Sequence, residues 1–440
     1  MQINKTSLPA LVDLPVERLL DHLNGLKLSE REHQIANRIL REIRSRLEFM
    51  ISVGLPYLTL NRHSSTLSGG ETQRINLVTS LGSSLVGSMY ILDEPSVGLH
   101  PRDTHLLVDV LKRLRDLDNT VIVVEHEEAV IREADHIIDI GPGAGYLGGD
   151  IVFQGNLKTM LSSGKTLTAD YLNKKRNIPL PEKRKSWQHS IRFNGIRQHN
   201  LKLDSIELPL EVMTVVTGVS GSGKSTLVRD VISPVVSRKL GDYSRKPGLY
   251  KSAEGAFSMI RDVQYVDQNP IGKSSRSNPV TYIKAWDDIR YLYASQKLAK
   301  QRKYKPAFFS FNVDGGRCEA CKGEGVIKVE MQFMADVYLT CEECHGRRFR
   351  DEILEVKFQG RTIFDVLEMT INEAIDFFAQ SKGKYEKHIV SLLSNYQKVG
   401  LGYLKMGQAS NTLSGGESQR IKLASYLSKE SADPGLFIFD

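Results

Sequence analysis

The spacing of hydrophobic residues first predicts helices. Residues 29–32 (Ser-Glu-Arg-Glu) have the form of a capping box, and an apolar residue then recurs at every fourth position from Ile35 to Leu47, which is typical of one helix face. The opposite face carries arginines, which suit either a solvated surface or a nucleic-acid contact: Arg38, Arg41, Arg44 and Arg46. Helical patterns also cover residues 71–81 and 106–114, and another begins at residues 373–378.

Short continuous apolar runs predict strands. Residues 90–92 and 120–124 lie on either side of the helical stretch 106–114. Residues 212–217 precede a Gly-rich loop and a helix that begins at Lys224. Apolar strands that alternate with helices are typical of a parallel sheet buried on both faces. The pattern therefore predicts an α/β fold.

The chain also contains an internal repeat. Residues 53–58 (VGLPYL) reappear at 399–404 (VGLGYL), and residues 66–75 (TLSGGETQRI) reappear at 412–421 (TLSGGESQRI). Both pairs are offset by 346 residues, which chance does not produce. The chain therefore holds parts of two homologous units, which are too few and too far apart for a solenoid.

Each copy of the repeat leads into a related apolar strand. The first copy continues to MYILDEP at residues 89–95, and the second continues to LFIFD at residues 436–440, so that Asp440 aligns with Asp93. We expect a glutamate to follow Asp440, and we expect the chain to be an internal part of a longer protein.

Composition narrows the class of protein. The 440 residues are 40% hydrophobic, which supports a sizeable core, and no apolar run approaches the roughly 18 residues of a membrane span. The first residues do not resemble a signal peptide, so we expect a cytoplasmic protein without a membrane partner. A net charge of +7 permits a nucleic-acid partner. Basic residues that are spread over the chain and have no binding role would give the same net charge.

The Gly-rich loop fits the P-loop pattern G-x-x-x-x-G-K-[ST]. Its residues are Gly218-Val219-Ser220-Gly221-Ser222-Gly223-Lys224-Ser225-Thr226, between a predicted strand and a predicted helix, as the motif requires. Backbone N–H groups of such a loop surround phosphate oxygens, Lys224 neutralises their charge and the Ser225 hydroxyl binds Mg²⁺. The motif indicates a site for ATP and Mg²⁺.

Polar residues at the ends of the two predicted strands are candidates for catalysis. Asp93 ends the first strand, where a carboxylate can hold Mg²⁺, and Glu94 can activate water as a general base. His126 follows the second strand and could reach a γ-phosphate. Taken singly, the acidic pair could instead start a helix, and the histidine could be structural.

The repeated Leu-Ser-Gly-Gly-Glu motif offers a second phosphate-binding geometry. Ser68, Gly69 and Gly70 in the first copy, and Ser414, Gly415 and Gly416 in the second, each combine a hydroxyl, two glycines and a helix start. One copy would be no more than a helix N-cap, but two copies in a chain with a P-loop indicate a nucleotide-binding role.

All four cysteines of the chain lie in one short window. Cys318-x2-Cys321 and Cys341-x2-Cys344 are separated by 19 residues, a spacing typical of a structural Zn²⁺ site, with redox-active pairs as the alternative. Basic and aromatic residues interleave around them, which suits a nucleic-acid surface or a solvated face: Lys322, Lys328, Arg347, Arg348, Arg350, Phe333, Tyr338 and Phe349.

These motifs together resemble a known family. The P-loop, the paired LSGGE motifs, residues 92–95 (LDEP) and His126 resemble ABC-type ATPases. The cysteine module lies between the P-loop and the second LSGGE motif. Together with residues 216–224 (VTGVSGSGK), 267–272 (DQNPIG), 276–279 (RSNP) and 315–321 (GGRCEAC), it resembles the UvrA family. Its members are the A subunits of the bacterial excinuclease ABC system, and the resemblance covers essentially the whole chain.

The resemblance implies a fold and a function. We expect two partial ABC-type P-loop ATPase units, each with a parallel or mixed sheet flanked by helices and a helical signature subdomain, and an inserted zinc module. The family surveys duplex DNA for helix-distorting damage as an ATP-dependent homodimer and loads the excinuclease B subunit. The zinc module is associated with DNA contact and damage discrimination.

The resemblance also implies roles for single residues. Gln268 corresponds to the Q-loop glutamine, and Asp93, Glu94 and His126 correspond to the Walker B aspartate, the catalytic glutamate and the switch histidine of the first unit. One ATP site would join the P-loop, Gln268 and Asp440 to the Ser68 motif of the other unit. The second site would join Asp93, Glu94 and His126 to the Ser414 motif, but it would have no P-loop.

Family parts missing from this sequence limit what we expect of it. They are the P-loop of the first unit, the module that binds the excinuclease B subunit and a large insertion domain. We expect nucleotide binding at Lys224, poor ATP hydrolysis and no complex with that partner protein. The alternatives are another soluble ABC ATPase, which the cysteine module disfavours, or an inactive zinc- and nucleotide-binding remnant.

The expected domain order follows from the same motifs. The first unit would comprise a signature subdomain at residues 1–88 and a Walker B and switch part at 89–172, followed by a linker at 173–190. The second unit would comprise a P-loop part at 191–295, the basic segment and zinc module at 296–360, and its own signature subdomain at 361–440.

Overall fold

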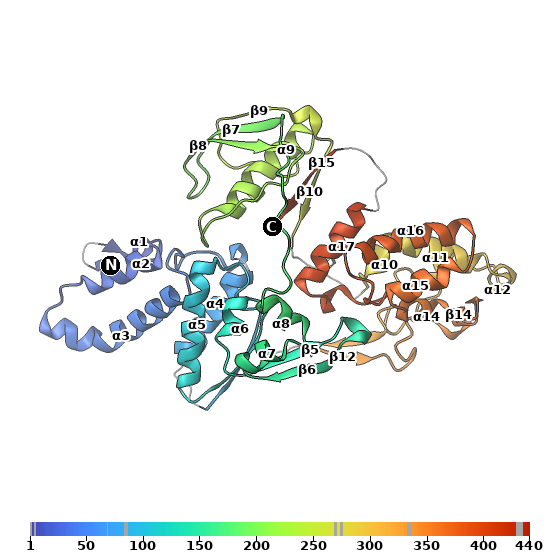
Figure 1. The fold of residues 1–440 in the computed structure, drawn as a ribbon, viewed down its shortest axis with the longest axis horizontal. Coiled ribbons are helices and arrows are strands. Elements are labelled where there is room, and N and C mark those ends of the chain that lie inside the picture. The colour runs from blue at the N-terminus through green and yellow to red at the C-terminus, as the bar shows by residue number, and fades with distance from the viewer. Residues whose placement is uncertain are drawn as a thin grey trace. The chain divides into compact units, whose positions relative to one another are not determined.

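The structure is a computed structural model that describes residues 2–3, 6–67, 69–82, 87–267, 271–272, 276–331, 336–427 and 434–440. The chain forms two compact units. Unit 1 comprises residues 1–142, 150–235 and 245–256, and unit 2 comprises residues 143–149, 236–244 and 257–440. Figure 1 labels many of the elements of both.

Unit 1 mixes short sheets with helices. Its elements, in chain order, are β1 (Gln2–Ile3), β2 (Thr6–Ser7), α1 (Leu8–Val12), α2 (Val16–Asn24), α3 (Glu30–Ser52), η1 (Ser64–Thr66), α4 (Gly69–Gly82), β3 (Met89–Asp93), α5 (Pro101–Asp116), β4 (Thr120–Val124), α6 (Glu128–Arg132), β5 (Ile137–Gly141), β6 (Asp150–Gly155), α7 (Leu157–Ser163), α8 (Leu167–Leu172), β7 (Ser190–Ile196), β8 (Leu203–Pro209), η3 (Thr226–Ile232), the start of α9 (Ser233–Lys239) and β9 (Ser252–Gly255).

The long helix α3 begins as predicted, but half of its apolar face is uncovered. Ser29 and Glu32 form the reciprocal capping box. Leu47 is buried against α1 and α2, whereas Ile35 and Ile39 are 71% and 62% exposed. The nine residues of α2 span only about 14 Å, so this helix cannot cover all 23 residues of α3.

The parallel pair β3 and β4 is half-buried, and the prediction of fully buried strands is wrong. Asp93 lies opposite Val124 in the register. Tyr90, Leu92, Val121 and Val123 pack on the core that includes α5. The alternate side chains, such as Ile91, point away from this core and are exposed, because no described element covers that face of the pair.

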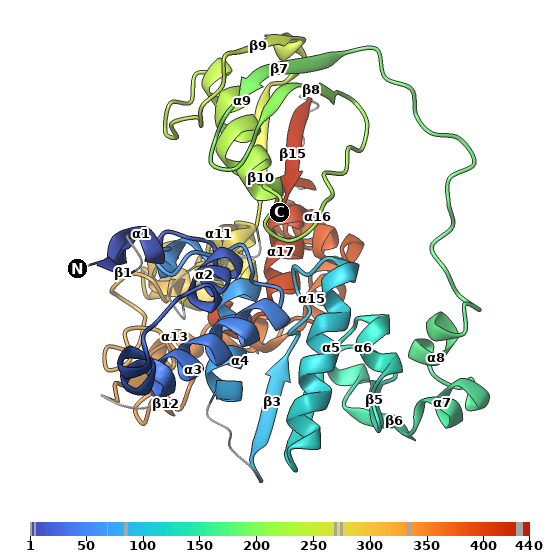
Figure 2. The ribbon, with the colours of Figure 1, turned by 90° about the vertical axis from the view of Figure 1, so that its left-hand side faces the viewer.

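The predicted strand at residues 212–217 does not form. Met213 is 88% exposed, and among the described residues no strand pairs with this stretch. An apolar run becomes a strand only where a ladder partner accepts its backbone hydrogen bonds. The neighbouring sheet is instead a three-stranded antiparallel one, in the order β8-β7-β9, and an irregular chain connects α8 to β7 (Figure 2).

Unit 2 is mainly helical. Its elements are η2 (Gly145–Leu147), the end of α9, η4 (Phe257–Met259), β10 (Asp262–Val266), α10 (Pro279–Tyr282), α11 (Ala285–Ala294), α12 (Lys297–Gln301), η5 (Pro306–Phe309), β11 (Val326–Val329), β12 (Val337–Thr340), α13 (Asp351–Leu354), β13 (Lys357–Phe358), β14 (Arg361–Thr362), α14 (Ile363–Glu368), α15 (Ile371–Ala379), α16 (Lys384–Lys398), η6 (Ser410–Thr412), α17 (Gly415–Leu427) and β15 (Gly435–Phe439).

One large hydrophobic cluster holds unit 2 together. It joins α11, α14, α15, α16 and α17 with the segments on either side of the cysteine hairpin, and Trp286 and Phe311 lie in it with ring centroids 5.2 Å apart. Tyr396 is fully buried in the same cluster, and its hydroxyl donates to the carbonyl of Pro279. The cysteine module is therefore fixed to the core of unit 2 rather than attached by a linker.

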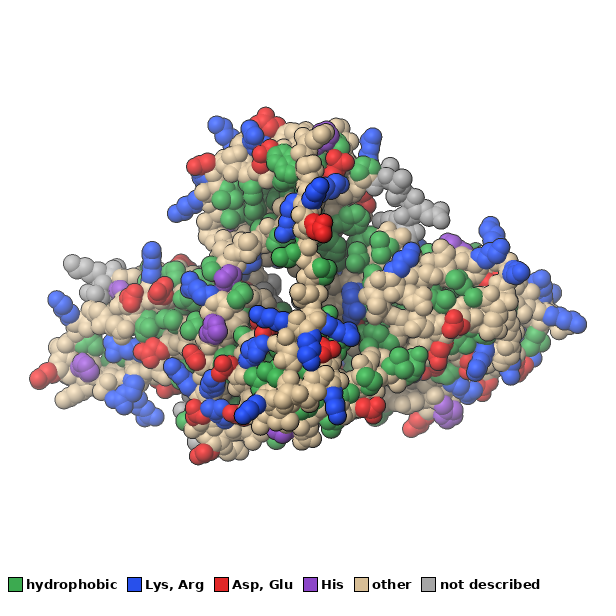
Figure 3. Space-filling model, in the orientation of Figure 1, with side chains coloured by type: hydrophobic (Ala, Val, Ile, Leu, Met, Phe, Trp, Pro, Cys, Tyr) green, Lys and Arg blue, Asp and Glu red, His purple; other side chains and the backbone are tan. Residues whose placement is uncertain are grey.

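Surface charge and helix hydropathy bear on the possible partners. On the face drawn in Figure 3, basic side chains are interspersed with acidic ones. Among the described residues, no helix combines the length and the apolar character that crossing a membrane requires.

Candidate nucleotide and metal sites

The P-loop encloses its own lysine. Lys224 Nζ donates to the carbonyls of Gly218 and Val219, at 2.9 and 3.0 Å. Gly223 has φ +100°, and a Cβ there would lie 2.7 Å from the side chain of Leu201, so only glycine fits this close approach. The loop thus curves around the position that Lys224 occupies and places this cation at its centre.

The helix after the P-loop forms as predicted, but it is widened. It starts at Lys224, continues as the π-helix η3 and becomes regular at α9. Pro234 has no N–H to donate back along the helix, and the carbonyl of Asp230 instead accepts from the N–H of Gly248 at 2.7 Å. The proline therefore contributes to the irregular hydrogen bonding of this helix.

Within unit 1 the P-loop of the second repeat lies against residues of the first. Ser220 Oγ donates to the carbonyl of Gly98, five residues beyond Asp93, at 3.1 Å. A Cβ on Gly221 would lie 2.8 Å from the ring of Tyr57. The P-loop is therefore in contact, through Gly221 and Tyr57, with the segment that precedes the first LSGGE motif.

The acidic pair and the histidine of the first repeat meet at the carboxyl end of β3 and β4. His126 Nε2 lies 3.5 Å from Glu94 Oε1, and both side chains face solvent. Glu94 has φ +44°, and its N–H donates to Val124. Glu125 supports the turn by accepting from the N–H groups of Ser96 and His126. The geometry leaves Glu94 and His126 open to a ligand.

The two helices that begin at the LSGGE motifs, α4 and α17, are called the signature helices. Each is held by a tyrosine that the motifs alone do not indicate. The Tyr57 hydroxyl donates to Glu71 at 2.7 Å, and the Tyr403 hydroxyl donates to Glu417 at 2.6 Å. Burial and this carboxylate raise the pKa of both tyrosines, against the opposing charges of Arg74 and Arg420. The repeat itself carried the signal, because each tyrosine stands 14 residues before its glutamate.

The two signature motifs are described to different extents. Ser68 lies outside the described residues, and Gly69 and Gly70 begin α4. In the second copy Ser414 and Glu417 cap α17 reciprocally, and Ser414, Gly415 and Gly416 are exposed. An exposed, capped helix start is free to meet an anionic ligand.

Of the remaining predicted nucleotide contacts, Asp440 lies in unit 2, directly after β15. The strands β10 and β15 pair in parallel, and Asp440 accepts a hydrogen bond from the Tyr265 hydroxyl at 2.5 Å. Gln268 lies outside the described residues, but the preceding Asp267 forms an ion pair with Lys422 of α17.

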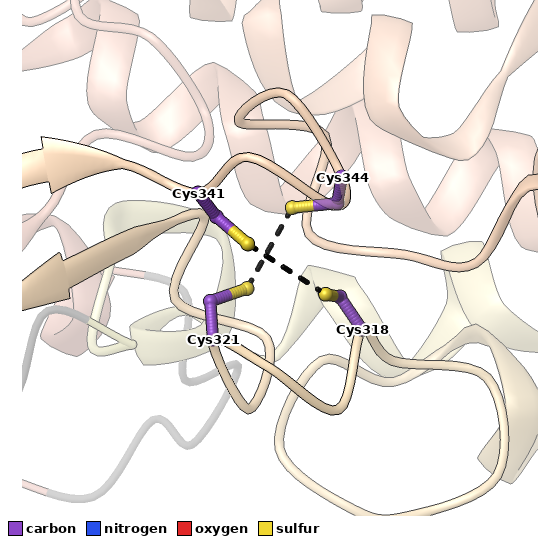
Figure 4. Close-up of side chains that lie close together, drawn as sticks. All are labelled: Cys318, Cys321, Cys341 and Cys344. Atoms are coloured by element: carbon purple, nitrogen blue, oxygen red, sulfur yellow. Dashed lines mark hydrogen bonds between the residues drawn. The ribbon is translucent and has the colours of Figure 1, made fainter.

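The four cysteines converge on one centre (Figure 4). All four Sγ atoms lie within 4.8 Å of one another, and all four residues are buried free thiols. Cys318 and Cys341 are 3.9 Å apart, and Cys321 and Cys344 are 3.6 Å apart. Sulfurs bound tetrahedrally to zinc at about 2.3 Å would be about 3.8 Å apart, so the set fits Zn²⁺.

The two cysteine pairs form equivalent knuckles. The N–H of Cys318 donates to the carbonyl of Arg348, and the N–H of Cys341 donates to the carbonyl of Gly325. Each acceptor stands in the other knuckle, four residues after its second cysteine, and both have positive φ. This reciprocal bonding holds the sulfurs of one knuckle against those of the other, rather than pairing them within a knuckle as in a redox disulfide.

The electrostatics of the cluster favour a cation. Burial raises the pKa of the Cys318 thiol to about 12 and also raises that of Cys344. Burial pushes the pKa of Cys341 upward as well, but the backbone N–H groups of Cys344 and Glu343 lower it overall. Four buried thiolates need a compensating positive charge, which a divalent cation supplies.

The aromatic residues of this module do not all reach the surface. Tyr338 is exposed on β12, but Phe349 is 1% exposed and packs edge-on against Phe311. Arg348 is also turned inward over the Phe311 ring. The interpretation of these two as surface residues is wrong, and Phe333 lies outside the described residues.

Together these features define the class of the fold. It consists of two partial ABC-type P-loop ATPase units, each with a signature helix, and an inserted four-cysteine module. No protein-family model matches the chain.

Individual relatives are more specific. The chain is 51% identical over 429 residues to UvrABC system protein A of Lactiplantibacillus plantarum, which covers 97% of this chain and 44% of the relative. It is 49% identical to the protein of the same name from Methanothermobacter thermautotrophicus, over 100% of this chain and 45% of the relative.

A solved structure matches the whole described fold. The crystal structure of UvrA2 from Deinococcus radiodurans has a TM-score of 0.91 and 39% identity, and the match covers 100% of this chain and 54% of that one. The chain is thus UvrA-like, and it spans about half the length of the curated relatives that it matches.

Proposed function

We propose that the chain carries nucleotide-, zinc- and DNA-binding parts of a UvrA-like ATPase that detects damage in duplex DNA. The similarity to proteins named for the UvrABC system supports this role. We place the protein in the cytoplasm, and we propose that its longer relatives act as homodimers that load the excinuclease B subunit.

The contact between Gly221 and Tyr57 is the observation that carries the nucleotide-binding part. It brings a P-loop from one repeat to the signature segment of the other. Residues 218–226 would hold the phosphates, with Ser225 on Mg²⁺, and Tyr57 would lie beside them, in the segment that precedes the first LSGGE motif. Bound Mg²⁺ would offset the charge of the ATP phosphates.

Poor hydrolysis follows from the division of residues between two sites. Glu94 and His126 would serve a second site, and the sequence has one match to the P-loop pattern. The P-loop site would therefore lack the general base, and the absence of such a base typically slows a reaction by about 10²–10⁴-fold.

The zinc part rests on the fit of the four sulfurs to a tetrahedron. Cys318, Cys321, Cys341 and Cys344 would hold Zn²⁺ as a closed structural site, because four protein ligands leave no position for a substrate. Zinc would fix the hairpin β11–β12, and this hairpin exposes Tyr338 as a surface for stacking with a base.

Binding of lesion-bearing duplex tests the proposed function. Fluorescence anisotropy with the 440-residue chain should show tighter binding to a duplex with a bulky adduct than to the undamaged duplex, with an affinity that falls steeply as salt rises. Equal binding to both duplexes that does not change with salt would contradict the proposal and favour the alternative, an inactive zinc- and nucleotide-binding remnant. Because we recognise no module for the excinuclease B subunit in this sequence, gel filtration should show no stable complex with that protein.

A further inference from the structure

One arginine connects the cysteine module to the loop before the second signature motif. The carbonyl of Arg348 accepts from the N–H of Cys318 at 2.9 Å, and its guanidinium Nη2 donates to the carbonyl of Gly407 at 3.1 Å. The guanidinium also lies over the Phe311 ring, 5.7 Å from the centroid. The two ends of this residue therefore contact a metal knuckle and the 407 loop.

The loop that Arg348 contacts leads directly into the signature motif. Gly407 donates its N–H to Leu367 at 2.8 Å. Three residues later Ser410, which is fully buried, starts η6, and the exposed Ser414 follows η6 after Leu413. A shift of Gly407 would therefore pass through seven residues to the helix start that we propose faces ATP.

A second path connects the same parts. Glu324, in the first knuckle, lies 3.6 Å from Arg276. The next residue, Ser277, accepts the N–H of Ser410 at 2.8 Å, and the Ser410 hydroxyl donates to Gly272 at 3.0 Å. These contacts close a ring that contains both knuckles, Gly272, residues 276–277 and the loop that precedes the second LSGGE motif.

The first repeat holds its equivalent loop in a different way. Asn61 stands 346 residues before Gly407, and its N–H donates to the carbonyl of Val12, as that of Gly407 does to Leu367. Its side chain then bonds Asp13 at 2.9 Å. In the second repeat a Cβ on Gly407 would lie 2.9 Å from the side chain of Leu367, and it is Arg348 that contacts the loop.

We propose that Arg348 is a positioning residue that holds the second signature motif in register with the cysteine knuckles, so that metal occupancy governs the order of residues 405–416. The inference rests on the proposed zinc site. It makes the zinc module a structural support for nucleotide contacts as well as a surface for DNA.

Hydrogen exchange with mass spectrometry tests the proposal on the 440-residue chain. In the zinc-loaded protein, Arg348→Ala should speed exchange in peptides from 405–416 by roughly tenfold, the factor for one lost charged hydrogen bond, while α16 stays unchanged. Zinc content should remain that of the unaltered chain, because the contact with Cys318 uses the backbone of residue 348. Stripping zinc from the unaltered chain should produce the same increase.

The matched control is Arg347→Ala, because Arg347 contacts Cys344 and Asp351 but not the 407 loop. If Arg347→Ala and Arg348→Ala change residues 405–416 equally, or if zinc removal changes the knuckles alone, the proposal is wrong. A chain that retains no zinc refutes the metal site instead, and metal analysis shows that separately. Arg348→Lys keeps the positive charge and the aliphatic stem, so residues 405–416 should exchange at a rate between those of the unaltered chain and Arg348→Ala. This variant replaces Arg348→Ala in the test if the alanine variant folds poorly.

Discussion

Tyr57 and Glu71 are joined by a 2.7 Å hydrogen bond that recurs 346 residues later between Tyr403 and Glu417. In both repeats the tyrosine reaches from the loop before the signature motif to the first turn of the signature helix. Tyr57 also lies under Gly221 of the P-loop. One side chain therefore connects the start of a signature helix to the loop that we propose binds phosphate.

Loss of the Tyr57 hydroxyl should destabilise unit 1. Glu71 is 7% exposed, and a buried carboxylate that loses a hydrogen bond costs about 1.5–3 kcal/mol. Tyr57→Phe should therefore lower the urea midpoint clearly. Tyr403→Phe should cost less, because Glu417 is more exposed than Glu71.

The comparison for this pair is Tyr385→Phe, since Tyr385 is 38% exposed and stacks on Tyr291. The urea midpoint, measured by circular dichroism, should be lower for Tyr57→Phe than for Tyr385→Phe. Equal midpoints for Tyr57→Phe and Tyr385→Phe would mean that the hydrogen bond contributes nothing measurable.

Gly221→Ala should weaken nucleotide binding. The new methyl group would press on the Tyr57 ring, at a residue with φ +75°, so the P-loop must move. Gly87→Ala is the matched control, because Gly87 has φ +70° and nothing lies within 4 Å of its added Cβ. Titration with a fluorescent ATP analogue should show a weaker affinity for Gly221→Ala and an unchanged affinity for Gly87→Ala. Equal affinities for the two variants would mean that the contact between Gly221 and Tyr57 does not shape the nucleotide site.

Removal of a single cysteine should release the metal. Cys341→Ser replaces one thiolate of the set, and the purified variant should contain no stoichiometric zinc and should unfold at a lower temperature. His345→Ala tests whether the neighbouring imidazole is a ligand instead, and it should retain zinc. Zinc loss in His345→Ala with zinc retained in Cys341→Ser would contradict the four-cysteine site.

The ion pair between Lys422 and Asp267 should stabilise unit 2 more than a surface pair does. Lys422 is 12% exposed and connects α17 to the end of β10. Lys422→Met should cost about 1–3 kcal/mol, because it leaves a partly buried carboxylate without this partner. Lys405→Met breaks the exposed pair with Glu368 and should cost at most about 1 kcal/mol. Chemical denaturation that ranks the two variants in the opposite order would contradict this account.

Much of the site could be predicted from local sequence, because its motifs are short and contiguous. The P-loop, each cysteine knuckle and the positions of Glu94 and His126 directly after strands depend on a strand end, a turn or a helix start. The state of residues 212–217 and of Ile35 depends instead on what covers them, which no local pattern contains. Arg348 and Gly407 are 59 residues apart, and nothing in either neighbourhood marks them as partners.

Steady-state ATP hydrolysis by the 440-residue chain, with Lys224→Ala as the control, tests the central claim most directly. The division of residues between two sites predicts that the chain binds nucleotide but that its turnover stays at the level of the Lys224→Ala variant. Turnover that Lys224→Ala abolishes would contradict this claim. Glu94 or another acid would then have to supply the base at the P-loop site.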